Sequence, residues 1–215
     1  MARERDLFYK FVRFKVRWLF FGPLGGLSVV HRGRVPESGP VILAPNHVSF
    51  LDPPAVACSS RRHLRFMAQH DLFKSPIFGW LIRRLGSFPV RRGKADTTAI
   101  RTALRVLQNG EALLVFPEGG RGDGRTLQSA NKGVTLLALM SGAAVVPVGI
   151  CNTDRMMPKG AKFPRRSRVT VVFGEPFTYA EVESRLGRKE AKRKFGEILM
   201  GKIAALMHEG GWKER

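Results

Sequence analysis

Short apolar runs alternate with longer segments of helical periodicity along most of the chain. Runs rich in β-branched and other apolar residues predict strands near 27–31, 40–44, 87–91, 112–116, 144–150 and 168–173. Helices are predicted near 53–60, 71–85, 95–109, 131–142 and 188–208. Several of the strands are continuously hydrophobic, which is typical of strands covered on both faces. The alternation favours an α/β fold, a single domain with a central mixed sheet flanked by helices.

Residues 7–21, LFYKFVRFKVRWLFF, mix aromatic and basic side chains. On a helical wheel at about 100° per residue, one side carries Lys10, Arg13 and Arg17. The opposite side carries the apolar residues Leu7, Phe8, Phe11, Val12, Trp18 and Leu19. Such a helix is suited to a membrane interface, and we expect Phe8, Phe11 and Trp18 to contact lipid. The alternative is a helix packed on the domain's own core.

Neither a cleaved signal peptide nor a spanning helix is expected. Basic residues run through the apolar part of the N-terminal segment, and no small-residue cleavage site follows it. No uninterrupted apolar stretch approaches the roughly 20 residues that a spanning helix needs. A chain of 215 residues suits one sizeable core. We therefore expect an amphipathic membrane-interface helix (1–26), an α/β core (27–178) and a C-terminal helical segment packed on that core (179–215).

The charge balance predicts a negatively charged partner. Lys and Arg number 37 against 17 Asp and Glu, and the formal net charge of +20 is spread over the chain. Nucleic acid, an anionic membrane surface, and acidic small molecules such as phosphates or coenzyme A all fit this charge. Because the sequence has no zinc-finger spacing, RNA-recognition aromatic motif or heptad-bearing basic region, no nucleic-acid partner is expected.

The histidines and cysteines predict no metal site. The 5 histidines form no metal-binding spacing such as H-E-x-x-H. Cys58 and Cys151 are far apart in the sequence and lie in apolar surroundings. We interpret them as buried free thiols in a reducing compartment.

Polar clusters follow three of the predicted strands. His47 comes after the first of these strands, Arg91 and Arg92 after the second, and Glu118 with Arg121 after the third. Ligands of open α/β sheets bind at the carboxyl ends of the strands, so these clusters are expected to converge on one crevice. A lone His–Asp pair, such as His47 with the carboxylate five positions later, would otherwise be interpreted as an ordinary loop feature.

Four short motifs resemble, in order and spacing, those of the glycerolipid acyltransferases. They are NHVSFLD (46–52), GSFPVRR (86–92), FPEGGR (116–121) and VVPVGI (145–150), and NKG (131–133) also resembles the family's lysine-glycine. The branch that they resemble most is that of the bacterial 1-acylglycerol-3-phosphate acyltransferases. The last of the four is interpreted as a core strand without catalytic residues.

The resemblance implies transfer of a fatty acyl group from a thioester to the free hydroxyl of a lysophospholipid acceptor, giving phosphatidic acid. The thioester is that of acyl-CoA or acyl carrier protein, used as co-substrate without a further cofactor. The expected location is the cytoplasmic face of the cell membrane, as a peripheral protein. Two alternatives stay open: an acyltransferase for another lysolipid, and a basic lipid-binding protein without catalysis.

His47 is the expected general base, because a histidine can remove a hydroxyl proton near neutral pH. Asp52 is expected to hold the imidazole and to stabilise the imidazolium. Five residues on a regular helix would leave the two about 140° apart. We therefore place His47 before the first turn, with Ser49 or Asn46 as a possible cap, and Asp52 just before Pro53. With no G-x-S-x-G elbow and no cysteine beside a histidine, direct attack by the acceptor is expected.

Arg91 and Arg121 match arginine positions of the family, and the guanidinium fork suits a phosphate. Arg92 is a weaker candidate. All three would otherwise be surface charges.

Three further positions are candidates for substrate binding. Glu118 is expected either to orient Arg121 or the acceptor hydroxyl, or to be a structural carboxylate bonded to nearby amides. Gly119 belongs to a glycine-rich turn that would allow close approach of an anion, and Gly120 departs from the family's usual threonine. Lys132 opens a predicted helix, where it could meet a phosphate or the coenzyme, or be an ordinary solvated lysine.

Overall fold

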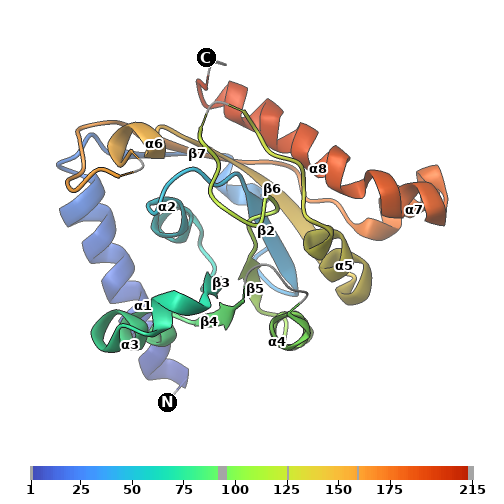
Figure 1. Cartoon of the computed structure of the whole chain (residues 1–215), viewed down its shortest axis with the longest axis horizontal. Helices are drawn as coiled ribbons and strands as arrows, with labels where there is room; N and C mark the ends of the chain where they lie inside the picture. The colour runs from blue at the N-terminus through green and yellow to red at the C-terminus, as the bar shows by residue number, and fades with distance from the viewer. Residues whose placement is uncertain (1, 92–95, 125, 159, 213–215) are drawn as a thin grey trace.

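The structure is a computed structural model that describes residues 2–91, 96–124, 126–158 and 160–212. In these residues seven strands form one sheet in the order β1-β7-β6-β2-β5-β3-β4 (Figure 1). Their bounds are β1 Leu27–Val30, β2 Val41–Pro45, β3 Leu64–Gln69, β4 Ser87–Val90, β5 Ala112–Leu114, β6 Ala144–Cys151 and β7 Val169–Phe173. The strands from β6 to β4 are mutually parallel, whereas β7 is antiparallel to β6 and β1 is parallel to β7. The predicted mixed α/β sheet is confirmed.

Helices cover both faces of this sheet (Figure 1). The α-helices are α1 Ala2–Lys15, α2 Asp52–Ser59, α3 Pro76–Arg84, α4 Thr97–Gln108, α5 Lys132–Ser141, α6 Thr153–Met156, α7 Tyr179–Leu186 and α8 Arg188–Glu209. A π-helical turn, η1 (Val16–Phe21), continues α1, and two short 3₁₀ helices are η2 (Arg32–Arg34) and η3 (His70–Phe73). Helices α4, α5, α7 and α8 pack on one face, and η1 and α2 pack on the other.

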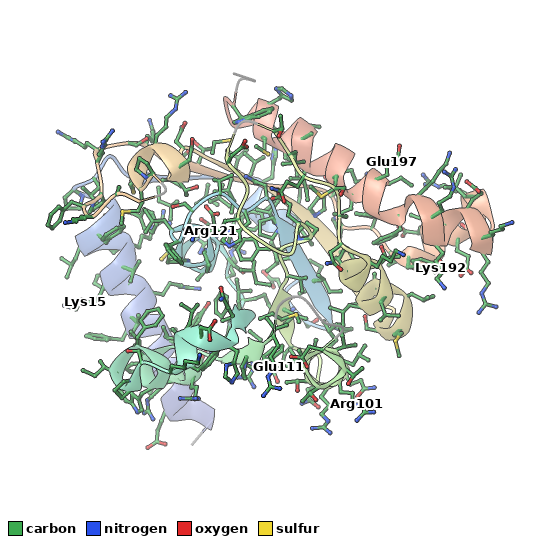
Figure 2. The ribbon with its side chains drawn as sticks, in the orientation of Figure 1. Lys15, Arg101, Glu111, Arg121, Lys192 and Glu197 are labelled. Atoms are coloured by element: carbon green, nitrogen blue, oxygen red, sulfur yellow. The ribbon has the colours of Figure 1, made fainter. Side chains whose placement is uncertain are left out.

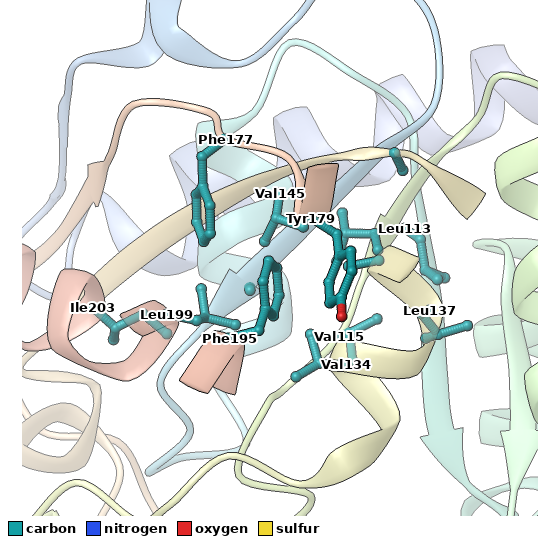
Figure 3. Packing of buried hydrophobic residues seen from close by; sticks show 14 of the residues in the cluster. Leu113, Val115, Val134, Leu137, Val145, Phe177, Tyr179, Phe195, Leu199 and Ile203 are labelled. Atoms are coloured by element: carbon teal, nitrogen blue, oxygen red, sulfur yellow. The ribbon is translucent and has the colours of Figure 1, made fainter. Parts of the chain in front are cut away.

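A hydrophobic core lies on each face of the sheet, because successive side chains along a strand point to opposite faces. Ile42 of β2 belongs to the cluster under α4, α5, α7 and α8, whereas Leu43 belongs to the cluster under α2. Both residues are fully buried, as the continuous hydrophobicity of the strand predicts. Figure 3 shows the first cluster, where the ring of Phe195 lies between Phe177 and Tyr179, with ring centroids 5.3 and 5.5 Å away.

Gly149 in β6 lets α8 approach the sheet closely. A Cβ added at this position would lie 2.7 Å from the backbone of Leu206 and of Met207 in α8. A larger residue would push α8 away from the central strand. The VVPVGI motif is therefore a core strand with a packing glycine, and its burial confirms the prediction.

The predicted strands are all found within two residues at each end, but β3 was not predicted. Its sequence, LRFMAQ, carries polar side chains at Arg65 and Gln69, and only Leu64 is buried. The helix predicted for 71–85 is divided, because Ser75 caps a new helix that starts at Pro76. Neither α6 nor α7 was predicted as a separate element. The expected start of α4 at 95 lies outside the described residues.

The N-terminal helical segment is attached to the body by two basic residues, Arg13 of α1 and Arg17 of η1. The Arg13 guanidinium donates to the Ser60 carbonyl at 2.7 Å, and that of Arg17 donates to the Cys58 carbonyl at 3.2 Å. These carbonyls lie at the C-terminal end of α2, where a helix favours cations. Of the three cations on this side of the helical wheel, only Lys10 is exposed, paired with Asp6, whereas Arg13 and Arg17 face the body.

The opposite side of α1 is apolar and exposed to solvent. Its exposed residues, spaced three or four apart, are Leu7, Phe11 and Phe14 of α1 and Trp18 of η1, each 58–60% exposed. Phe8 is half-buried, since its ring packs edge-on against Trp80 of α3, 6.1 Å between centroids. Tyr9 faces the body and is buried. The helix therefore packs on the core through one side and leaves an apolar stripe uncovered.

No helix in the described part of the chain is long and apolar enough to cross a membrane. Cys58 and Cys151 are buried and free, as expected, and burial raises the pKa of both thiols to about 11.

Candidate active site

The predicted polar clusters lie along one large cavity at the carboxyl ends of the parallel strands. The cavity has a volume of about 2340 Å³, and its lining includes His47, Arg91, Gly119, Arg121 and Lys132. In Figure 2, Arg121 lies near the middle of the molecule. The expected convergence of three strand ends on one site is thus found in the structure.

His47 and Asp52 are in direct contact. The Nδ1 atom of His47 lies 2.8 Å from Oδ2 of Asp52, which is fully buried. Oδ2 also accepts from the backbone N–H groups of Val48, at 2.7 Å, and Ser49, at 2.8 Å. A carboxylate that receives several N–H groups is held in one position, so Asp52 fixes both the loop and the imidazole.

The local sequence explains why the pair meets although the two residues are five positions apart. Asp52 is the first residue of α2, followed by Pro53 and Pro54, which favour the first turn of a helix. The preceding residues fold back over this turn, so His47 does not lie on the helix. The expected cap was wrong: Leu51 is the N-cap residue and makes no side-chain cap bond.

Ser49 and Asn46 have other partners. Ser49 Oγ donates to the Met157 carbonyl at 3.1 Å. The Asn46 amide donates to the Ile150 carbonyl at 3.0 Å and accepts from the Ile150 N–H at 2.7 Å. Asn46 therefore ties the end of β2 to β6 and fixes where the His47 loop begins. We had not predicted this role; the signal was an asparagine directly after a buried strand.

The other ring nitrogen of His47, Nε2, is left for a substrate. The imidazole stacks on Phe116, with 3.8 Å between ring centroids. Because one ring face is covered by Phe116 and Nδ1 is bonded to Asp52, the ring presents a single nitrogen to the cavity. A carboxylate accepts the Nδ1 proton, so Nε2 is the acceptor of the neutral imidazole.

Glu118 holds the His47 loop by its backbone. Its Oε1 accepts from the His47 N–H at 2.6 Å, and its Oε2 accepts from the Gln128 N–H at 3.2 Å. Burial raises the pKa of Glu118, and the two backbone hydrogen bonds oppose that shift. These two hydrogen bonds to backbone N–H groups match the interpretation of Glu118 as a structural carboxylate, which here positions His47. Substrate binding by Glu118 stays a prediction.

Arg121, Arg91 and Lys132 line the same cavity but differ in their contacts and exposure. The guanidinium of Arg121 lies over the Phe50 ring, 3.6 Å from its centroid. Arg91 is exposed, and its backbone N–H donates to Asp96 at 2.9 Å. Lys132 is exposed and is the first residue of α5. Arg92 lies outside the described residues.

Two neighbouring glycines shape the turn after β5. Gly119 has φ +72°, and a Cβ there would lie 3.3 Å from the Asn131 side-chain nitrogen. This position favours glycine both by conformation and by space. Gly120 also lines the cavity, but no atom lies within 4 Å of a Cβ added there. A threonine would fit at Gly120, so its absence leaves extra space beside Arg121.

In the described residues, no group of three or more His, Cys, Asp or Glu side chains could hold a metal ion. The polar groups of the site instead include one His–Asp pair and several cations, and the cavity lining also contains amide, hydroxyl and carboxylate side chains among its many apolar residues.

Comparison with known proteins relates this arrangement to a family. The family model described as Acyltransferase matches residues 27–151, more than half of the chain, and this span contains every motif named above. The chain belongs to the Acyltransferase family.

Two curated members of the Acyltransferase family illustrate the range of similarity. A 1-acyl-sn-glycerol-3-phosphate acyltransferase of Streptococcus pneumoniae is 29% identical over 181 residues, covering 82% of this chain and 65% of the relative. A lyso-ornithine lipid O-acyltransferase of Pseudomonas aeruginosa is 34% identical over 119 residues, covering 55% of this chain and 45% of the relative. The chain thus spans less than two thirds of the length of either relative.

A solved structure of the same family has a similar fold. The crystal structure of the 1-acyl-sn-glycerophosphate (LPA) acyltransferase PlsC from Thermotoga maritima is 26% identical, with a TM-score of 0.79. The match covers 99% of this chain and 84% of that one. It therefore includes both the sheet and the helices α1 and α8.

Proposed function

We propose that this protein transfers a fatty acyl group from a thioester to the free hydroxyl of 1-acylglycerol-3-phosphate, giving phosphatidic acid. The observation that carries the proposal is the 2.8 Å contact between His47 Nδ1 and the buried carboxylate of Asp52, with the imidazole on the wall of a large cavity. The names of the Streptococcus and Thermotoga relatives support the same reaction.

The chemistry follows from this pair. Nε2 of His47 accepts the proton of the acceptor hydroxyl as its oxygen attacks the thioester carbonyl. Asp52 stabilises the imidazolium that forms. The tetrahedral intermediate then collapses, the carbon–sulfur bond breaks, and the thiolate takes the proton from the imidazolium. The new carbon–oxygen bond is the ester, and no acyl-enzyme is formed.

The cations on the cavity wall support a phosphorylated acceptor. Arg91 and Arg121 come from the ends of different strands and line the same cavity as His47. Two guanidinium groups can hold one phosphate, which would place the hydroxyl of a glycerol backbone near the base. We assign the phosphate to Arg91 and Arg121, and Lys132 to a phosphate of either substrate.

The size of the cavity supports two lipid chains at once. Pockets for single ligands of drug size have volumes of about 300–1,000 Å³, and this cavity, at about 2340 Å³, is more than twice as large. Its wall beside α1 and α3 is mostly apolar, with Val12, Val16, Leu81 and Ile82 among the lining residues and Arg13 as a charged exception. We assign this part to acyl chains.

The exposed apolar stripe on α1 and η1 supports attachment to a membrane surface, and the formal net charge of +20 favours an anionic one. Leu7, Phe11, Phe14 and Trp18 are all exposed on one side of α1 and η1. The inner side of the same helical segment lines the cavity through Val12 of α1 and Val16 of η1. A helix at the membrane interface would therefore bring lipid chains next to the cavity without passing them through water.

The Pseudomonas relative favours a second acceptor, a lyso-ornithine lipid, by its name and its 34% identity. The space beside Gly120 would accept a different head group. A lipid without phosphate, however, would leave Arg91 and Arg121 without the anion that their placement suits.

The test is an acyl-transfer assay with purified protein in lipid vesicles. Each thioester donor, acyl-CoA and acyl carrier protein, is paired with lysophosphatidic acid, lyso-ornithine lipid and other lysolipids. We expect ester formation on lysophosphatidic acid, with lower kcat/KM for acceptors that lack a phosphate. Vesicle binding without transfer to any acceptor would overturn the proposal in favour of a lipid-binding protein.

A further inference from the structure

The cavity has a second end, away from α1, between α5 and α8. Helices α1 and α8 lie on opposite sides of the molecule (Figure 1), yet residues of both line the one cavity that contains His47. At this end α5 and α8 are close together: a Cβ added to Gly196 of α8 would lie 3.8 Å from the Thr135 side chain of α5 and 3.0 Å from that of Ala130, just before α5. We call this end the α5–α8 groove.

The floor of the α5–α8 groove is apolar or small. Leu136 and Leu139 of α5 line it and are 40% and 37% exposed. On the α8 side the lining includes Gly196, Met200 and Ala204. Such a floor accepts a slender chain and offers few fixed polar partners.

The outer rim of this groove is strongly basic. We define the α8 patch as Arg185, Arg188, Lys189, Lys192 and Arg193, all of them exposed. Lys189, Lys192 and Arg193 line the cavity, and Lys192 is labelled on α8 in Figure 2. In the described part of the chain only Arg193 of the patch forms an ion pair, with Glu190 at 2.7 Å. Glu197 lies further along the groove and is the other carboxylate of its lining on α8.

We infer that the α8 patch docks a small acidic carrier protein that presents the thioester donor, whose flexible arm runs along the α5–α8 groove to His47. The inference rests on the proposed function and extends it by naming the donor's carrier. Positive charge at the entrance attracts an acidic partner and accelerates encounter. Exposed Leu136, Leu139 and Met140 of α5, the helix that packs against α8, supply the apolar contact that a protein interface needs.

Two features favour an acidic protein over coenzyme A as the occupant of the α8 patch. The charges extend over nine residues of sequence, from Arg185 near the end of α7 to Arg193 of α8, and two of the five, Arg185 and Arg188, lie outside the lining of the cavity. Nucleotides are held in concave sites. Among the described residues, none of those lining the groove on α5 and α8 is aromatic, so no ring is available there to stack on an adenine. A broad basic surface that continues beyond the cavity instead complements a protein surface of opposite charge.

The test compares donors in a variant that removes three charges from the patch, Arg188→Gln, Lys189→Gln and Lys192→Gln. Its matched control removes three exposed charges from the loop before β7, Lys162→Gln, Arg165→Gln and Arg166→Gln. None of those three side chains lines the cavity or forms an ion pair with a described residue. Steady-state rates are measured with acyl carrier protein and with acyl-CoA of the same chain length, on a short-chain soluble lysophosphatidic acid.

The patch variant should lose about tenfold or more in kcat/KM for the acyl carrier protein, through KM, because steering by charge raises association rates by at least that factor. Its kcat/KM for acyl-CoA should stay near wild type, and the control variant should keep both. The difference between patch variant and wild type should fade as salt is raised.

Several outcomes would overturn the inference. An equal loss of kcat/KM with both donors would mean that the α8 patch binds a part that acyl-CoA and acyl carrier protein have in common. A loss confined to acyl-CoA would place coenzyme A on the patch, and unchanged kinetics would leave the patch without a part in donor binding. Wild-type protein that transfers acyl groups from neither donor would instead defeat the proposed function itself, so the two failures are distinguishable.

Discussion

Replacing Asp52 by Asn tests how His47 is held and how its charged form is stabilised. The carboxylate is fully buried and receives N–H groups from His47, Val48 and Ser49 through one oxygen. An amide can still accept these bonds through its carbonyl oxygen, but it brings no negative charge to the imidazolium. A charge-assisted hydrogen bond contributes about 1.5–3 kcal/mol, and each 1.36 kcal/mol in the barrier is about tenfold in rate. The expected loss in kcat is therefore about 10-fold to 150-fold.

The measurement is the rate of a single turnover with saturating donor and acceptor, beside a thermal unfolding curve. Ser49→Ala is the matched control, because it removes the neighbouring bonds of the Ser49 hydroxyl, to the Met157 carbonyl and from the Leu51 N–H, without touching the imidazole. This control should unfold at a lower temperature and keep kcat near that of the wild type. Folded Asp52→Asn protein with wild-type kcat would refute the assignment of Asp52.

Three further predictions concern other parts of the account. Arg91→Ala and Arg121→Ala should each raise KM for lysophosphatidic acid by the equivalent of about 1.5–3 kcal/mol and leave KM for the donor unchanged; donor-selective losses in steady-state kinetics would reverse the assignment. Burial raises the pKa of Glu118, so its carboxyl favours the folded state below its ordinary pKa and loses that contribution as pH rises through the raised value. The side chain of Glu118→Gln cannot titrate, so the free energy of unfolding of this variant should rise relative to that of wild type as pH rises, which urea unfolding at several pH values measures. KM for the acceptor should stay unchanged. A raised KM would mean that the charge of Glu118 binds substrate. Changing Phe11 and Trp18 to Ser should remove about 1.5–3 kcal/mol of apolar burial per side chain, releasing the protein from co-sedimenting vesicles while activity on a soluble acceptor remains; continued sedimentation would contradict the membrane role of α1.

The sequence predicts the sheet well where strands are buried on both faces. Continuous apolar runs mark β2 and β6, and both lie at the centre of the sheet. Strand β3 was missed because it lies toward one edge, beside the cavity, where only Leu64 is buried and polar residues interrupt the pattern. Its strand character comes from pairing with β5 and β4, which a local pattern does not contain.

Helix α1 shows where helical periodicity misleads. The wheel separates Lys10, Arg13 and Arg17 from the aromatic residues, and a membrane or solvent face was the natural interpretation. Two of these cations instead donate to carbonyls at the end of α2. A pattern in one helix does not show the dipole of its neighbour, so the inward use of arginine could not be predicted from it.

The sequence predicts contacts in the site between residues that are close in sequence, but not those between distant residues. His47 and Asp52 are close in sequence, and the loop before α2 brings them together, so their contact could be predicted. The link from Glu118 to the His47 N–H joins residues 71 positions apart, and its two possible roles could not be separated without the fold. Asn46 and its bonds to Ile150, 104 positions away, were missed for the same reason.

Single-turnover acyl transfer by the His47→Ala variant tests the central claim most directly. Wild-type and variant proteins, matched by unfolding temperature and by vesicle binding, are mixed with a thioester donor and lysophosphatidic acid, and formation of phosphatidic acid is followed over time. If His47 is the general base, the variant should be slower by about 10²-fold or more. A folded variant that transfers the acyl group at nearly the wild-type rate would contradict the mechanism, because in this mechanism the hydroxyl proton goes to His47.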